Sequence, residues 1–215
     1  MLAVSGIIFP LIVAVFAIIY AIDRPLYLRL VAEDGLIEWV TVGILLGGAA
    51  LGGLALRRLR AQSWRRRWFY AGFIAFCLFC IAEELSWGQR LFGFRSPPLF
   101  ETHARQRETN VHNLFQGFTT IKVKEIALGT FIVYGLALPA LMRLRPAVRA
   151  RVERTGFRVP DAALWPGFLV GSLLAFDRPK GARVEELSEL AYSIALVLFM
   201  FMELRRVSRD SPPPT

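Results

Sequence analysis

The sequence has few of the residues, and none of the motifs, that usually identify an enzyme. Only two cysteines and two histidines occur among 215 residues. Cys77 and Cys80 have a C-x-x-C spacing, but no second cysteine pair exists to complete a zinc site, so we interpret them as small apolar residues. A Walker phosphate loop, a dinucleotide-binding fingerprint, a G-x-S-x-G elbow and an H-E-x-x-H motif are absent. The enzyme classes that these motifs define therefore have no support.

Long stretches of the chain carry almost no charge, and these stretches predict the fold. The composition is 55% hydrophobic with a mean hydropathy of +0.46, which is too apolar for an ordinary soluble domain. We predict an all-α fold, a polytopic membrane helix bundle of about six transmembrane helices. Segment 162–176 is the shortest and contains Pro166 and Gly167, which leaves open whether it crosses fully. The predicted spans are 3–22, 36–56, 68–85, 126–142, 162–176 and 187–202.

The charged residues predict how the bundle is oriented. The linkers 57–67 and 143–158 carry six arginines each, with Glu153 as their one acid, and three more arginines lie near the C-terminus. The positive-inside rule places these 15 of the 26 basic residues in the cytoplasm. We therefore expect a multi-pass protein of the bacterial inner membrane with both termini in the cytoplasm. Thirteen of the 17 acids then lie on the periplasmic side.

The remaining features agree with a single transmembrane domain over residues 1–210. The first segment lacks a basic n-region and a small-x-small cleavage site, so we interpret it as an uncleaved span. The tail 211–215 is predicted to be disordered. The arginine clusters predict anionic lipid headgroups as partners and not nucleic acid, because the arginine runs are short linkers between spans. A small-residue face suited to close helix packing consists of Gly43, Gly47, Gly48, Gly52 and Gly53.

Two adjacent carboxylates end the third apolar segment. No residue from Trp68 to Ala82 is charged, so Glu83 lies roughly 22 Å along a helix that begins there. That depth is near the far boundary of a hydrocarbon core about 30 Å thick, where ionisable groups face a protein interior or a water-filled cavity. The helix dipole does not favour acids at this end. Glu83 and Glu84 are therefore either functional carboxylates or partners of Arg90 in an internal brace.

Two further acidic groups stand where the second and the last apolar segments begin. Acids in a first helical turn can simply complement the helix dipole. However, Asp34 and Glu38 share one helix face, as do Glu185 and Glu189, and like charges so placed need a cation or a proton between them. Glu38 and Glu189 lie beyond the first apolar residues of their segments. We expect these two side chains to point inward.

The loop 91–121 is the one long connection and holds both histidines. We expect it to lie on the periplasmic side and to fold over the mouth of the bundle. If the loop is helical, Glu108 and His112 share a face, as two ligands of one metal or as a carboxylate that orients an imidazole. The alternative is a solvated helix without a function.

Together these residues predict one polar site at the periplasmic face. The catalytic candidates are Glu83, Glu84, His112 and Arg90. A carboxylate-rich set with one histidine suits a divalent Zn, Mn or Fe ion, whereas without a metal crowded carboxylates could perform acid–base chemistry. The candidate metal ligands are Glu84, Glu108 and His112. The supporting residues are Glu38, Gln89, Asn110, Asn113 and Glu189.

Two stretches carry a signature, E-E-L-S-W-G-Q-R at residues 83–90 and E-T-N-V-H-N-L at residues 108–114. The combination resembles an uncharacterised family of bacterial multi-pass inner-membrane proteins, over roughly residues 33–115. No activity is established for that family, so the resemblance implies a membrane fold and no catalytic role.

Three functions are compatible with these observations. The first is a membrane-embedded enzyme, with or without a metal, that acts on a lipid or lipid-linked substrate, with Arg90 as a clamp for an anionic headgroup. The second is a non-catalytic subunit or assembly factor of a membrane complex, with other membrane proteins as partners. The third is a proton-coupled transporter, which the apolar cytoplasmic halves of the spans disfavour.

Overall fold

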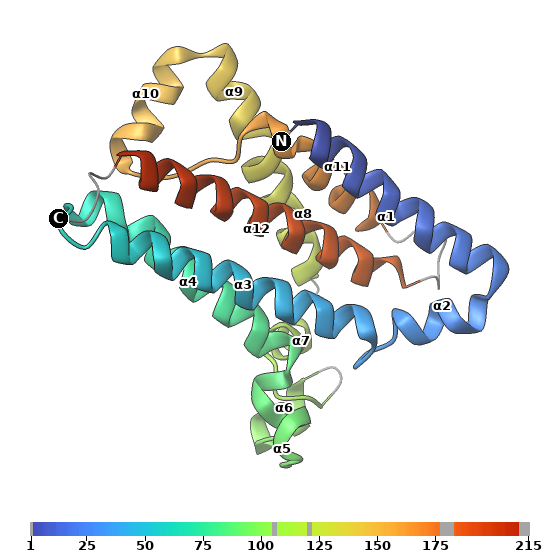
Figure 1. Cartoon of the computed structure of the whole chain (residues 1–215). Coiled ribbons are helices and arrows are strands. Elements are labelled where there is room, and N and C mark those ends of the chain that lie inside the picture. The colour runs from blue at the N-terminus through green and yellow to red at the C-terminus, as the bar shows by residue number, and fades with distance from the viewer. Residues whose placement is uncertain (1, 105–106, 120–121, 177–182, 211–215) are drawn as a thin grey trace.

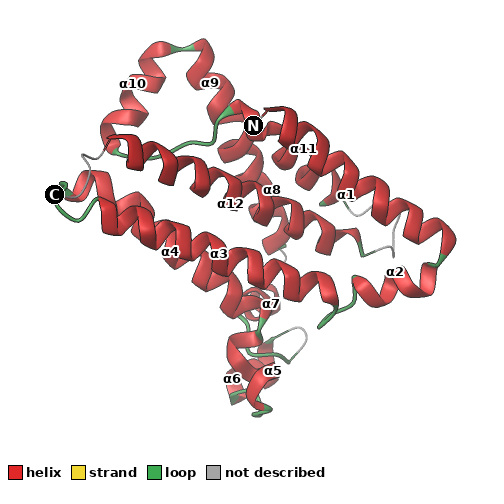
Figure 2. Ribbon diagram, in the orientation of Figure 1, coloured by secondary structure: helices red, strands yellow, loops and turns green. Residues whose placement is uncertain are grey.

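The computed structural model describes residues 2–104, 107–119, 122–176 and 183–210. Across these ranges the chain is entirely helical, as predicted, and the connections are short (Figure 2). The tail 211–215, for which we predicted disorder, lies outside the described residues. The helices longer than one turn are α1 Leu2–Ile22, α2 Arg24–Leu30, α3 Leu36–Arg58, α4 Trp64–Glu84, α5 Gln89–Phe92, α6 Pro98–His103, α7 Val111–Phe118, α8 Val123–Ile132, α9 Leu138–Leu144, α10 Pro146–Thr155, α11 Trp165–Leu174 and α12 Val184–Asp210.

Four helical stretches of the described residues are long and apolar enough to cross a membrane. They lie in α1, in α3, in the continuous run α8–α9 and in α12. A fifth is α4, which continues after a 62° bend into the segment Ser86–Phe92. This confirms an all-helical fold with four or five helices that could span a membrane. The predicted span 162–176 forms only the shorter apolar helix Ala162–Leu174, about 20 Å long at 1.5 Å per residue.

Helices α3 and α12 form the centre of the bundle. Helix α3 packs against both α4 and α12, α12 packs also against α11, and α1 lies along α11 (Figure 1). Helices α5, α6 and α7 form a separate projection beyond the end of α4, which we call the outer segment (residues 86–104 and 107–119).

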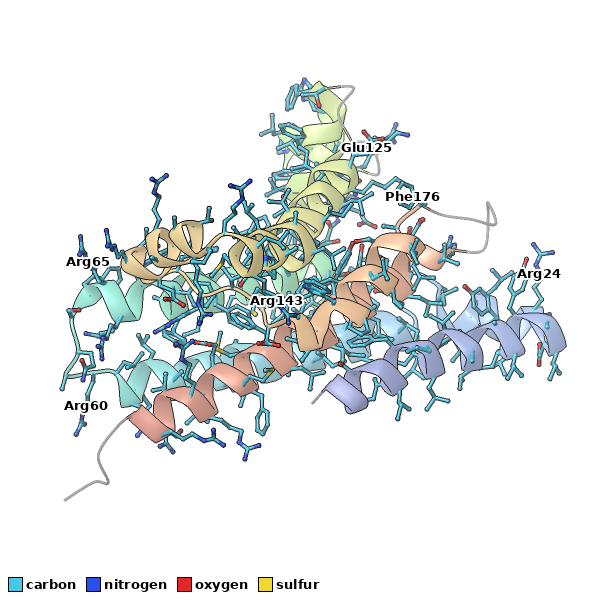
Figure 3. The ribbon with its side chains drawn as sticks, turned by 90° about the horizontal axis from the view of Figure 1, so that it is seen from above. Arg24, Arg60, Arg65, Glu125, Arg143 and Phe176 are labelled. Carbon is cyan, nitrogen blue, oxygen red and sulfur yellow. The ribbon has the colours of Figure 1, made fainter. Side chains whose placement is uncertain are left out.

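The two kinds of charge gather at opposite ends of the bundle. The linker between α3 and α4, the end of α10 and the end of α12 line a common cavity at one end. At the other end, acids from the starts of α3 and α12 and the end of α4 come within electrostatic reach of one another. Figure 3 shows Arg60 and Arg65 at the first end and Arg24 far from them at the second. Arg24 and Arg90 are bases near the acidic end, so the separation of the two kinds of charge is not complete.

Close helix contacts are made at selected glycines. A Cβ on Gly48 would meet Val197 at 3.1 Å, and one on Gly52 would meet Ile74 at 3.0 Å, so both lie against neighbouring helices. Gly43, Gly47 and Gly53 have no neighbouring atom within 4 Å of such a Cβ. The predicted small-residue face is therefore right for two of its five members. The others lie on sides of α3 that no described helix covers closely.

The tightest approach in the run α8–α9 is at Gly135. It lies in the π-helical turn Val133–Ala137 (η2), just before Pro139, which lacks the N–H that a regular helix would use there. A Cβ on Gly135 would lie 2.2 Å from the ring of Phe168, and that ring is fully buried. Because the ring has no free space to move into, even one added methyl group forces the helices apart.

We expect Gly135→Ala to lower the free energy of unfolding by about 1–3 kcal/mol through overpacking. Unfolding by denaturant in detergent micelles measures this effect. Gly129→Ala is the matched control on the same run, because no atom lies within 4 Å of its added Cβ. It should be neutral or stabilising by up to about 1 kcal/mol. An equal loss in both variants would contradict the packing argument.

Candidate functional site

The site is built around an abrupt turn at the end of α4. The helix ends at Glu84, and Ser86, Trp87 and Gly88 follow with φ angles of 46°, 54° and 86°. Left-handed backbone costs a non-glycine residue about 1–2 kcal/mol, so two such residues need compensation. Ser86 donates to Glu108 Oε2 at 3.0 Å, and the Trp87 indole donates to Glu83 Oε1 at 2.6 Å. These bonds stabilise the turn and aim the next residues back at the bundle.

Arg90 emerges from this turn and binds three carboxylates. Its guanidinium lies 2.7 Å from Glu38, 3.1 Å from Asp34 and 3.2 Å from Glu108. Glu38 is 6% exposed and uses its second oxygen to accept the Asp34 backbone N–H at 2.7 Å. Arg90 is thus the cation that the Asp34/Glu38 pair needs. Its partners in the structure are not Glu83 and Glu84, with which the brace interpretation paired it.

Glu83 is held by four donors. It accepts hydrogen bonds from the backbone N–H groups of Val111 and His112, both at 2.9 Å, in addition to the Trp87 indole. Its Oε2 also lies 3.1 Å from Nδ1 of His112. A carboxylate at the first N–H groups of α7 is favourable because those groups have no partner within the helix. Glu83 therefore fixes both the start of α7 and the orientation of the His112 ring.

The predicted pairing of Glu108 with His112 on one helix face is wrong. Helix α7 begins only at Val111, and Asn110 is its N-cap, with extended backbone and a side chain that accepts from the Asn113 N–H at 3.1 Å. Glu108 precedes the helix and turns to Ser86 and Arg90 instead. Because Asn110 is the N-cap, the helix starts after Glu108. The four-residue spacing of Glu108 and His112 places them on one face only if both lie in the same helix.

Gln89 connects the two halves of the outer segment. Its side-chain oxygen accepts from Ser96 Oγ at 3.1 Å and from the Thr109 backbone N–H at 2.8 Å. The single proton of the Ser96 hydroxyl is shared between this oxygen and the closer Arg107 carbonyl, at 2.6 Å. Ser86, Ser96 and Thr109 had no assigned role in the sequence, although Ser86 and Thr109 lie inside the two signature stretches. Only Ser86, two residues after Glu84, lies close to paired carboxylates in the sequence, and Ser96 and Thr109 have no such signal.

Glu84 and Glu189 form a different kind of contact. Their carboxyl groups lie within hydrogen-bonding distance of each other, between the end of α4 and the start of α12. Neither is held in an ion pair within the described ranges. Glu84 is half-buried, Glu189 is accessible to water, and His112 lies within electrostatic reach of Glu84. The two carboxyl groups therefore face each other without a described cation between them, and we call them the Glu84/Glu189 unit.

The predicted metal ligands are not gathered into a single set. Among the described residues no group of three or more histidine, cysteine or acidic side chains is arranged to hold a metal ion. The physical reason is that the predicted ligands have other partners. Glu108 binds Arg90 and Ser86, His112 faces Glu83, and Glu84 faces Glu189.

A polar cavity of about 620 Å³ opens beside Gln89 in the outer segment. It contains two arginines, Arg95 and Arg107, which form no ion pair with any described acid. Both are exposed, and the sequence had suggested no role for either. The cavity is lined by Gln89, Phe94, Arg95, Ser96, Glu101, Thr102 and Arg107.

No protein-family model matches the chain, and no curated protein or solved structure is detectably similar to it. The resemblance to an uncharacterised membrane-protein family therefore stays a prediction. Any function must be argued from the geometry of the site.

We expect Arg90→Gln to lower the free energy of unfolding by roughly 2–4 kcal/mol. The variant leaves the buried Glu38 without its cation, and the cost stays below that of a fully buried pair because Arg90 is 19% exposed. Denaturant unfolding in micelles measures it, and adding Glu38→Gln should recover part of the loss. Arg149→Gln, which removes the exposed pair with Glu153, is the control and should leave stability unchanged. Equal effects of the two arginine variants would contradict a central role for Arg90.

Proposed function

We propose that the chain is a six-segment protein of the bacterial inner membrane with both termini in the cytoplasm. The gathering of the arginine-rich linkers at one end of the bundle and of the acids at the other supports this orientation. Helix Ala162–Leu174 then crosses only part of the bilayer, with its termini covered by α1 and α12.

Cysteine labelling tests the orientation. In a background with Cys77 and Cys80 replaced by alanine, we expect Glu101→Cys to react with a membrane-impermeant maleimide in intact spheroplasts. Arg60→Cys should react only after lysis. Both parent side chains are exposed, so access is set by the membrane and not by the fold. The reverse pattern would contradict the proposed orientation.

We infer that the outer end is an acid–base site of an enzyme that acts on a lipid or lipid-linked substrate. The observation that carries this inference is the combination of two units. Glu83 orients His112 through Nδ1, which leaves Nε2 as the nitrogen available to a substrate. The Glu84/Glu189 unit lies within electrostatic reach of His112, and in this proposal it shares one proton, because two facing carboxylates would otherwise repel each other. His112 then serves as general base and the carboxyl unit as general acid.

The surroundings of the site favour an amphipathic substrate. Trp87, Phe92, Phe94 and Phe118 are exposed apolar side chains of the outer segment, as expected for a surface that touches the bilayer interface. Arg90 is saturated by carboxylates, so it is a positioning residue and not the headgroup clamp. The unpaired arginines of the 620 Å³ cavity suit an anionic headgroup better.

Turnover measurements test the proposed enzyme. The purified full chain is reconstituted in vesicles of bacterial lipid extract, and lipid masses are followed by mass spectrometry. We expect Glu84→Gln and His112→Asn to reduce conversion by about 10²–10⁴-fold, the usual contribution of a general acid or base. Glu125→Gln, at an exposed acid near the start of α8 that lines neither cavity, is the control and should keep full activity. Unchanged conversion in folded Glu84→Gln would rule out the acid role.

The alternative is a non-catalytic subunit of a membrane complex. The exposed aromatic side chains of the outer segment also suit contact with another membrane protein. In that case the parent chain converts no lipid. Crosslinking in membranes should then attach the partner protein to the parent and to the Glu84→Gln variant, but not to the Phe92→Glu variant.

A further inference from the structure

The end of the bundle opposite to the proposed active site contains a second built cavity. Its volume is about 410 Å³, within the usual range of small-molecule sites. Three distant parts of the chain form its walls, namely the linker between α3 and α4, the end of α10 and the end of α12. The lining residues are Leu59, Gln62, Ser63, Arg65, Arg66, Glu153, Arg154, Gly156, Arg158, Arg206 and Val207. We propose that this cavity binds the phosphate group of one anionic phospholipid.

The charges around the cavity are not balanced within the described residues. Glu203 lies 3.4 Å from Arg158 and 3.7 Å from Arg206, so one carboxylate is shared by two arginines. Glu153, the one acid that lines the cavity, binds Arg149 at 2.9 Å on its outer side.

The other cavity arginines have no acidic partner in the described structure. Arg66 is bonded only to the neutral Gln62, and Arg65 and Arg154 form no ion pair. Three uncompensated guanidinium groups around one cavity attract an anion, and guanidinium forks match phosphate oxygens in geometry.

The walls of the cavity are held in place by contacts that do not involve the guanidinium groups of Arg65, Arg66 and Arg154. Gly156 ends α10 with φ 81°, and its Cα approaches the Arg65 carbonyl so closely that an added Cβ would lie 1.8 Å from that oxygen. The Trp68 indole donates to the Thr155 carbonyl at 2.8 Å. Because backbone and aromatic contacts maintain the cavity, the arginines that face it can be replaced without removing its walls.

The position of the cavity favours a lipid over a soluble anion. It lies at the ends of α3, α4 and α12, all of which belong to candidate spans, so it opens at the level of the headgroups. Trp64 is exposed beside it, and exposed tryptophans are typical of that level. An acyl chain can then extend along the apolar surface of the helices while the phosphate enters the cavity.

Native mass spectrometry of the full chain in micelles tests the proposal. We expect one phosphatidylglycerol to bind in preference to phosphatidylcholine. The double variant Arg66→Ala/Arg154→Ala should weaken that binding at least about tenfold, since it removes two charge-assisted contacts. The matched control is Arg60→Ala/Arg151→Ala, which removes the same charge from the same two linkers at exposed positions outside the cavity. It should stay close to the parent.

Each other outcome overturns part of the proposal. Equal weakening in the two double variants would mean diffuse attraction of lipid to a basic surface and no defined site. A parent that binds both lipids alike would have no anion site. A second experiment measures the thermal unfolding temperature of the chain with and without pyrophosphate. Stabilisation that depends on Arg66 and Arg154, without preference for phosphatidylglycerol, would make a soluble phosphate the ligand and reject the lipid.

Discussion

The binding of Arg90 to three carboxylates is the interaction on which the outer end of this protein depends. Glu38 and Asp34 belong to the start of α3, and Glu108 belongs to the outer segment, so one guanidinium joins a central helix to the projection. A charge at this depth is tolerated only when it is paired, and Arg90 satisfies several acids at once. Without it the outer segment would lose its ion-pair connection to α3 and would be held by the bonds of Glu83 to Trp87, Val111 and His112.

The adjacent carboxylates Glu83 and Glu84 at the end of α4 have different partners. Successive side chains of a helix point about 100° apart, so Glu83 and Glu84 cannot face the same neighbour. Glu83 points toward α7, and its two oxygens accept hydrogen bonds from four donors. Glu84 points toward α12 and faces Glu189. The residue with every lone pair engaged positions the imidazole. Glu84, which has no ion-pair partner among the described residues, is therefore the one to which the proposed mechanism gives the acid role.

Much of the fold follows from hydropathy, but the site depends on contacts that spacing does not encode. The apolar segment 36–56 closely matches α3, and the end of the third apolar segment falls at the end of α4, because uncharged runs are a direct signature of bilayer length. About six spans were predicted, with the crossing of segment 162–176 left open, and this segment forms a helix about 20 Å long. The Glu108 error has a local cause, since Asn110 begins α7 after it. That Arg90 would meet α3, 52 residues earlier, has no local signal at all.

The opposite distribution of charge at the two ends connects these features. At the acidic end, Glu84 and Glu189 face each other without an ion-pair partner among the described residues, which is why the proposed mechanism gives this unit the role of acid. At the basic end, arginines outnumber acids, and an excess of guanidinium cannot be relieved by losing protons because that group stays charged. The proposed phosphate site rests on this excess of guanidinium, and the proposed acid–base site rests on the facing carboxyl groups at the other end.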